Sequence, residues 1–245
     1  MCMSRVRLHY NRAVEHYGRD NVLGVFLYGS QNYGCDLPSS DVDTKCILVP
    51  DLYHLAIKPY EVKHLHIPRE DGEHEVCECM PIQHMISNWK KQNPNFLEIL
   101  YTEHFVLNSE YFSSWQELVE MREAIAHYDV NKGLKSIAGQ ALHTLHENPY
   151  NGKKQGNAIR LQYLLEAHIQ GALYSDCLAP PPEIRKQVLN LKSGAETLDP
   201  AKVALLLEYF DRITRAKTEY RVLTELDPFF EHITLQFIQE RMLLD

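Results

Sequence analysis

The sequence predicts an α+β protein in which a small mixed β-sheet backed by helices is followed by an α-helical domain. Two observations lead to this fold class. Short apolar runs with strand-like alternation, separated by turn residues, are confined to residues 1–108. From residue 109 onward strand signals disappear, and long segments show helical spacing of apolar side chains. We therefore expect two domains, residues 1–108 and 109–245.

Helices and strands are expected to alternate in the first domain. Residues 4–17 combine apolar and charged side chains at helical spacing, and the apolar run 22–28 is typical of a buried strand. Arg69-Glu70-Asp71-Gly72 separates two alternating segments and predicts a hairpin. The expected strands are 22–28, 41–49, 63–67 and 75–79. The expected helices are 4–17, 51–57 and 81–91, the last with Pro81 at its first position.

The second domain is predicted to consist of helices that pack together and against the sheet domain. Ser114-Trp115-Gln116-Glu117 fits a capping box, and Asp199-Pro200 fits an N-cap followed by a first-turn proline. Helical spacing covers residues 109–127, 130–147, 154–175, 183–192, 200–224 and 228–242.

Composition narrows the classes of protein. The 245 residues carry a formal net charge of -8, which argues against broad electrostatic capture of nucleic acid but leaves room for a local patch that recognises one RNA end. No apolar stretch approaches the roughly 20 residues needed to span a bilayer, and the N-terminus lacks an apolar signal core. We expect a cytoplasmic protein without a membrane partner. Walker, Rossmann and zincin motifs are absent from the sequence.

The most informative segment is Leu27-Tyr28-Gly29-Ser30-Gln31-Asn32-Tyr33-Gly34, followed by Ser39-Ser40-Asp41-Val42-Asp43. Side chains at positions i and i+2 of a strand share a face, so Asp41 and Asp43 are expected to project together. Two such carboxylates repel each other unless a cation lies between them, and Mg²⁺ or Mn²⁺ prefers oxygen ligands. Gly29 permits a sharp turn, and Ser30 offers a hydroxyl and an amide to a phosphate. A short helix opening at Gln31 would add its N-terminal amides.

These residues resemble the Gly-Ser…Asp-x-Asp signature of the DNA polymerase β-like nucleotidyltransferase superfamily. Together with Asn93-Pro94-Asn95-Phe96-Leu97-Glu98-Ile99-Leu100, the pattern is similar to the predicted nucleotidyltransferases associated with RNA repair and phages. The resemblance is strongest over residues 22–101. It implies that Asp41 and Asp43 bind metal and act in catalysis, and that Gly29, Ser30 and Ser40 contact the nucleotide. After the second aspartate, where relatives commonly carry Arg-Gly, this chain has Thr44-Lys45-Cys46.

Enzymes of that superfamily use a third carboxylate on a neighbouring strand. Glu78, between Cys77 and Cys79, is our choice as the third catalytic and metal-binding acid. Strand alternation turns its flanking cysteines one way and Glu78 the other. Glu75 and Glu73 are the alternatives, and Glu75 would need the opposite strand face. Glu98 matches the family motif, but we expect it to have a structural role.

A basic cluster lies in the helical half at Lys153, Lys154 and Arg160. It resembles the family's helix facing the catalytic cleft, which implies that these cations stabilise the triphosphate and the departing pyrophosphate. We favour Lys154 and Arg160 as nucleotide-binding residues over Lys153. The alternative is that all three simply belong to the solvated face of a helix.

The resemblance implies a metal-dependent transfer of a nucleoside monophosphate from an NTP to an acceptor hydroxyl, with release of pyrophosphate. The acceptor remains open among an RNA 3′ end, a protein side chain and a small molecule. A different class of function is a catalytically inactive nucleotide-binding regulatory or interaction protein of the same fold. A weaker alternative is a purely structural helical adaptor.

Overall fold

The fold is built around a five-stranded mixed sheet, as seen in a computed structural model that describes residues 2–69, 71–217 and 219–244. The strands lie in the order β3-β4-β2-β1-β5. β2 and β4 run parallel, whereas the other neighbouring pairs are antiparallel. Their bounds are β1 Val22–Tyr28, β2 Asp43–Leu48, β3 Lys63–Pro68, β4 His74–Pro81 and β5 Phe105–Leu107. The predicted α+β class with a mixed sheet and further helices in the C-terminal part is confirmed.

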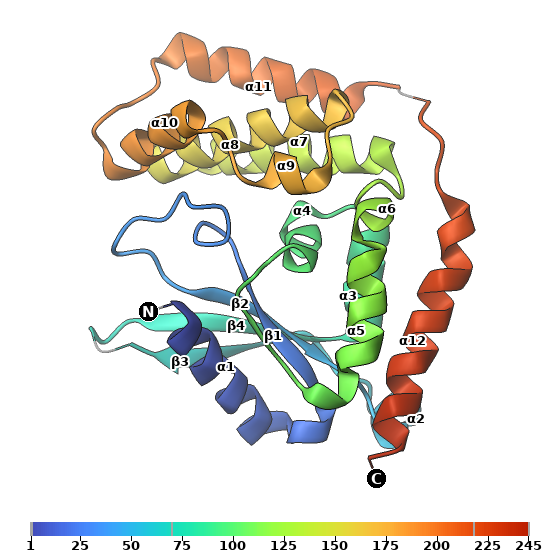
Figure 1. The fold of residues 1–245 in the computed structure, drawn as a ribbon. Coiled ribbons are helices and arrows are strands. Elements are labelled where there is room, and N and C mark those ends of the chain that lie inside the picture. Colours follow the sequence, from blue (N-terminus) through green and yellow to red (C-terminus); the bar gives the residue numbers. More distant parts are fainter. Residues whose placement is uncertain (1, 70, 218, 245) are drawn as a thin grey trace.

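Twelve α-helices are found in the described residues (Figure 1). Those up to residue 126 are α1 Cys2–Tyr17, α2 Leu52–Ala56, α3 Ile82–Lys90, α4 Pro94–Leu97, α5 Phe112–Glu120 and α6 Arg122–Ala126. The rest are α7 Val130–Glu147, α8 Gly152–Ile169, α9 Tyr174–Leu178, α10 Pro182–Ser193, α11 Pro200–Arg215 and α12 Asp227–Met242. None of the helices in the described part of the chain is long and apolar enough to cross a bilayer.

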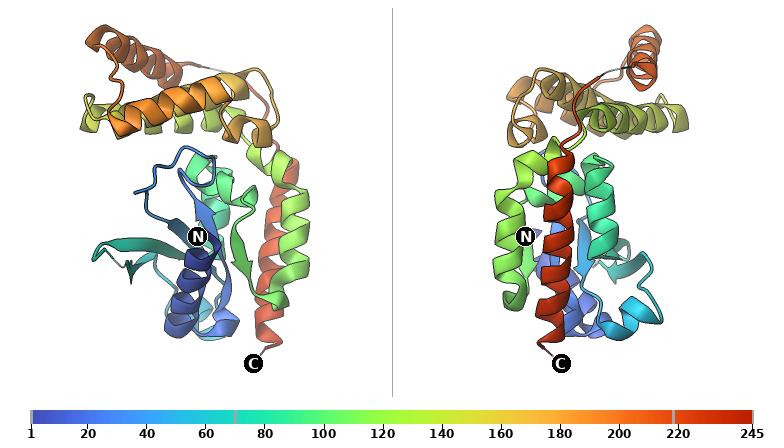
Figure 2. Two further views of the ribbon diagram at one scale, coloured as in Figure 1. Left: turned by 60° about the vertical axis from the view of Figure 1, so that its left-hand side comes forward. Right: turned by 90° about the vertical axis from the view of Figure 1, so that its right-hand side faces the viewer.

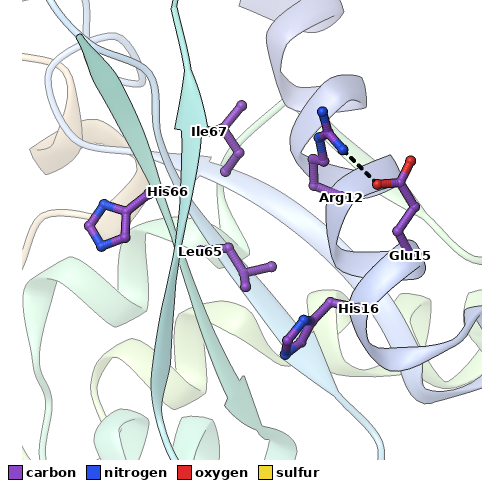
Figure 3. A pocket seen from close by; sticks show the side chains of 6 residues that line it. All are labelled: Arg12, Glu15, His16, Leu65, His66 and Ile67. Carbon is purple, nitrogen blue, oxygen red and sulfur yellow. Dashed lines mark hydrogen bonds and ion pairs between the residues drawn. The ribbon is translucent and has the colours of Figure 1, made fainter.

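One face of the sheet is covered by α1. Val25, Cys46, Cys77 and Cys79 are completely buried in the apolar cluster on this face, as strand alternation predicts for the two cysteines of β4. Figure 3 shows the same alternation in β3, where Leu65 and Ile67 point toward α1 and His66 points away. This face is therefore closed by packing, and the chemistry has to be sought on the other face or at the strand ends.

The opposite face carries the larger apolar core, and the remaining helices form two groups around it. α12 runs beside α3 and α5 along the sheet domain (Figure 2). Helices α7 to α11 form a separate layer above the strand ends, next to the turn that follows β1 (Figure 1). The predicted division after residue 108 thus separates helices that lie side by side, since α3 precedes it and both α5 and α12 follow it.

Several predicted elements differ from the structure. The helix expected at 109–127 breaks at Met121. The helix expected at 154–175 ends at Ile169, and the one expected at 200–224 ends at Arg215. Ser114 is not an N-cap, because the helix has already begun at Phe112 and the Ser114 hydroxyl donates to Glu240. Glu70 of the predicted turn and Thr218 of the predicted last-but-one helix lie outside the described residues.

The sheet also contains a strand that the sequence did not predict. β5 is only three residues long and pairs with β1 through Gly24, Val25 and Phe26. A Cβ atom at Gly24 would lie 2.9 Å from the carbonyl oxygen of Val106, so only glycine lets the two backbones approach this closely. A strand this short depends on its neighbour for its identity, which explains why the local pattern missed it.

Candidate active site

A tight turn ends β1 and forms the floor of a cleft. Gly29 has φ +83°, a conformation that L side chains rarely adopt. The Asn32 amide donates to the Gly29 carbonyl and the Cys35 amide to the Ser30 carbonyl, each at 2.9 Å. Residues 30–34 therefore form a hydrogen-bonded turn, and no helix begins at Gln31. A turn of this kind places Gly29 and Ser30 next to whatever the cleft holds.

Two carboxylates line the same cleft, but they do not both lie in the strand as expected. β2 begins at Asp43, opposite Tyr28, so Asp41 lies in the preceding loop rather than in the strand. This loop is held on both sides. The Gln31 side chain donates to the Asp41 carbonyl at 3.1 Å, and the Val42 amide donates to Glu75 Oε1 at 3.3 Å. The cleft, of about 170 Å³, is lined by both aspartates, Gly29, Ser30 and Ser40.

Electrostatics at Asp43 favour a cation beside it. Burial raises the pKa of the Asp43 carboxyl, and the nearby charge of Asp41 raises it further. Both effects penalise two ionised carboxylates in one place, and a bound cation removes that penalty. The Ser40 hydroxyl is used differently: it accepts a hydrogen bond from the Leu37 amide at 2.9 Å and so shapes the loop.

The opposite wall of the cleft is basic and comes from the helical layer. Lys153, Asn157 and Arg160 line it from α8, and Lys192 lines it from α10. The first three are spaced four and three residues apart, which places them on one face of a helix. Lys154 is one residue out of phase and forms an ion pair with Glu147 instead, with its side chain 37% exposed. The structure thus brings Lys153 and Arg160 to the cleft and leaves Lys154 outside it.

Arg160 is the most buried of these cations. It is only 4% exposed, and its guanidinium carbon lies 3.9 Å from the centroid of the Tyr33 ring. Its Nε atom is buried and has no hydrogen-bond partner among the described residues. Burial raises the pKa of the Tyr33 hydroxyl to about 12, which the adjacent Arg160 charge opposes. A desolvated guanidinium with an unused donor is suited to bind an anion.

Glu98 supports the turn from below. It is 2% exposed and lies in a 3₁₀ turn, Glu98–Leu100, immediately after α4. Its Oε1 atom accepts a hydrogen bond from the Gly29 amide at 3.0 Å, which agrees with the structural role expected for it. Burial raises the pKa of the Glu98 carboxyl, while Arg160 and the Gly29 amide act in the opposite direction.

The predicted third carboxylate, Glu78, does not line the cleft. It projects from β4 in register with Lys45 of β2 and forms an ion pair with the Lys45 ammonium group. Glu75, the alternative, lies on the opposite face under α1, where it pairs with Arg5 and His9 at 2.6 and 3.0 Å. Glu73 is exposed. Among the described residues no three His, Cys, Asp or Glu side chains converge in the manner of a complete metal site.

A divalent cation nevertheless fits the two aspartates. Mg²⁺ is usually held by one or two carboxylates together with substrate phosphates and water, rather than by an all-protein cage. Asp41 and Asp43 supply two carboxylates to one cleft, where burial and their mutual repulsion raise the pKa of Asp43 despite the nearby charges of Lys153 and Lys45. The site is thus suited to a metal ion that arrives with a phosphate ligand.

Three cleft residues, Lys192, Gln140 and Asn157, had not been singled out in the sequence. Lys192 donates from α10 to the Cys35 carbonyl, and burial lowers the pKa of its ammonium group. Gln140 and Asn95 also line the cleft, and the Gln140 amide donates to Asn95 Oδ1 at 2.9 Å. A sequence signal existed only for α8, in the four-then-three spacing of its polar residues. Lys192 and Gln140 reach the cleft through helix packing, which no local pattern indicates.

Larger cavities lie elsewhere, and two of them have several times the volume of this cleft. One of about 640 Å³ borders the far side of the loop before Asp41, and one of about 680 Å³ lies beside β5. The first is lined by charges that already pair within the chain, such as Arg5 with Glu75 and Arg69 with Asp71. Neither of them contains Asp41 and Asp43 or the cations of α8 and α10, which distinguishes the smaller cleft.

Comparison with known proteins gives limited information. No family model matches the chain, and no curated protein matches its sequence. The chain is similar to a solved structure from Exiguobacterium sibiricum described as a nucleotidyltransferase-like protein, with 12% identity and a TM-score of 0.36. That similarity covers 98% of this chain and 78% of the other. A TM-score of 0.36 is too low to define an activity, so the residues of the cleft have to carry any functional conclusion.

Proposed function

We propose that the protein is a metal-dependent nucleotidyltransferase, which moves a nucleoside monophosphate from an NTP to an acceptor hydroxyl and releases pyrophosphate. One observation carries the proposal: the two aspartates face Lys153, Arg160 and Lys192 across the turn at Gly29 and Ser30. A metal-bound triphosphate needs carboxylates on the side of its metal ion and cations on the side of its free oxygens. The cleft provides both within one small volume.

The cleft matches the phosphates better than the whole nucleotide. Its volume of about 170 Å³ is below the roughly 300–1,000 Å³ that encloses a drug-sized ligand. The phosphates would lie between the turn and α8, where the Ser30 hydroxyl and amide, Lys153 and Arg160 donate to their oxygens. The base and sugar would extend beyond the cleft toward the helical layer.

The reaction exchanges a phosphoanhydride bond for a phosphoester bond. The acceptor oxygen bonds to the α-phosphorus, the bond from that phosphorus to the bridging oxygen of pyrophosphate breaks, and the hydroxyl proton passes to solvent or a nearby base. A bound Mg²⁺ or Mn²⁺ would neutralise phosphate charge and lower the pKa of the acceptor hydroxyl. Asp41 and Asp43 would hold the cation, while Arg160 and Lys192 stabilise the charge that develops on the leaving group.

The proposal specifies that the acceptor carries a hydroxyl group and leaves open which molecule carries it. An RNA 3′ end, a protein side chain and a small molecule all remain candidates. RNA binding measured against salt concentration separates them, because a protein that makes few phosphate contacts shows a shallow slope.

The test is transfer of label from each α-labelled NTP, with Mg²⁺ or Mn²⁺, to total RNA or total protein. Asp41→Asn and Asp43→Asn are each expected to lower transfer by about 10²-fold or more, since electrostatic groups of this kind contribute on that order. Unchanged transfer in both variants would contradict the proposal. NTP binding that persists without any transfer by the wild-type protein would indicate the regulatory alternative instead.

Nucleotide affinity provides a matched pair of variants on one helix. Arg160→Met removes a buried cation, and charge-assisted hydrogen bonds of about 1.5–3 kcal/mol correspond to a Kd raised about 10- to 100-fold. Lys154→Met removes an exposed cation outside the cleft, and its Kd is expected to stay within about twofold of the wild type. Equal effects of the two substitutions would show that the cleft does not hold the triphosphate.

A further inference from the structure

A buried lysine lies on the sheet face that carries Asp43. Lys45 follows Asp43 by two residues in β2, so both side chains project from the same face of the strand. The Lys45 side chain is 2% exposed. Its Nζ atom lies 4.1 Å from the ring centroids of Tyr28 and of Phe96, so the charge is held between two aromatic faces.

The partner of this lysine is the acid expected to be the third metal ligand. The parallel register of β2 and β4 places Lys45 directly beside Glu78, and Glu78 Oε2 accepts from the lysine ammonium group. The other carboxylate oxygen, Oε1, lies 3.9 Å from His64 Nε2. Both oxygens of Glu78 therefore face nitrogen groups of the chain itself, and its negative charge is already balanced.

No other described acid replaces it. Glu75 is on the opposite face of the sheet, in ion pairs with α1. Glu98 accepts from the Gly29 amide through Oε1 and does not line the cleft. A second divalent ion would therefore find only the two aspartates that already serve the first. It would also have to displace or approach a lysine fixed by one carboxylate and two rings, which is unfavourable because the buried charge would lose its partner.

We propose that Lys45 is a built-in cation that takes the place of the second divalent ion, so that the site binds one Mg²⁺ or Mn²⁺, at Asp41 and Asp43, together with the triphosphate. This inference rests on the proposed function, because the first ion and the nucleotide come from it. Glu78 is then a positioning residue that holds Lys45 beside the site.

The number of ions bound is measurable without any turnover. Mn²⁺ bound per chain is counted by electron paramagnetic resonance, in the presence of a saturating NTP analogue whose α,β-bridging oxygen is replaced by a methylene group. The wild type is expected to bind one nucleotide-dependent Mn²⁺. Glu78→Gln is expected to bind one as well, with an affinity within about twofold of the wild type, because Glu78 is not a ligand.

Removing the lysine charge is expected to create the missing site. Lys45→Met keeps the length of the side chain and frees Glu78, so the count rises from one to two. Lys45→Met combined with Glu78→Gln returns the count to one. Lys63→Met, on the exposed strand β3, is the matched lysine control and leaves the count at one.

The outcomes separate this inference from the function on which it rests. Two ions in the wild type, or loss of an ion in Glu78→Gln, would overturn the inference and leave a nucleotidyltransferase with an ordinary metal pair. Absence of any nucleotide-dependent Mn²⁺ would overturn both. If Lys45→Met does not fold, the counts for the wild type and for Glu78→Gln still decide the question.

Discussion

The hydrogen bond between Glu98 and Gly29 joins the core to the cleft, and two substitutions measure its contribution to stability. Glu98→Gln keeps the size of the side chain and an oxygen that accepts from the Gly29 amide. Glu98→Ala removes the acceptor and leaves that amide without its partner, in a position where Glu98 is 2% exposed. Because both variants are neutral at this position, their difference reports packing and hydrogen bonding without the charge.

The expected difference follows from these contacts. An unsatisfied buried donor costs about 1–3 kcal/mol, and the one buried methylene group that is lost, Cγ, contributes about 0.8 kcal/mol. Glu98→Ala should therefore be less stable than Glu98→Gln by roughly 3 kcal/mol. For a chain of this size that corresponds to a difference in Tm of about 6–12 °C. Urea unfolding at pH 7 measures the free energies directly, and equal stability of the two variants would refute the role given to the hydrogen bond.

The pH dependence tests the electrostatic part of the same argument. Burial raises the pKa of Glu98 above its unfolded value of about 4.3. The native state then binds the proton more tightly than the unfolded state, so ionisation lowers the stability of the wild type as pH rises from about 4.3 through the folded pKa. Glu98→Gln lacks this loss. Its stability relative to the wild type should increase over that window and then level off, whereas a decrease would show that Arg160 and Lys45 outweigh burial.

Two further substitutions test how the turn and the loop are held. Gly29→Ala forces a side chain into φ +83°, which should lower the stability of the protein by about 1–2 kcal/mol. Gly139→Ala, in the open middle of α7, should instead raise the stability by about 0.5–1 kcal/mol. Thermal unfolding measures both changes, and Tm shifts of the same sign would contradict this expectation. Glu75→Ala leaves His9 and the Val42 amide without their acceptor, which should lower the free energy of unfolding by about 3–5 kcal/mol. The control is Glu73→Ala at an exposed position, where the change should stay within about 0.5 kcal/mol. Urea unfolding measures both, and similar losses would show that the buried pairs contribute little to stability.

Local patterns predicted the strands that are buried on both faces and the helices with strong caps. β1 begins and ends where its apolar run predicts, and α7 does so as well, because Asp129 accepts from the Lys132 amide at its start. Patterns failed where an element depends on a neighbour. β5 exists only through its pairing with β1, and the predicted long helix after residue 200 ends at Arg215.

The candidate site divides in the same way. The sequence indicated that one cleft is lined by Gly29, Ser30, Asp41 and Asp43, because the turn and the two acids are close together in the chain. Helical phase could have decided between Lys153 and Lys154, because Asn151 is the N-cap of α8 and fixes where the helix begins. That signal pointed to Lys153, Asn157 and Arg160.

The sequence alone indicated the positions of four strands along the chain, the turn after β1 and the two aspartates, because these depend on side chains that are neighbours in the chain. The tertiary structure was needed to show which cations face the two aspartates and that the expected third acid, Glu78, pairs with Lys45. The pairing of Lys45 with Glu78 depends on the register of two parallel strands. Residues 33 positions apart meet only after the sheet has formed, and a shift of one residue would turn Glu78 to the other face.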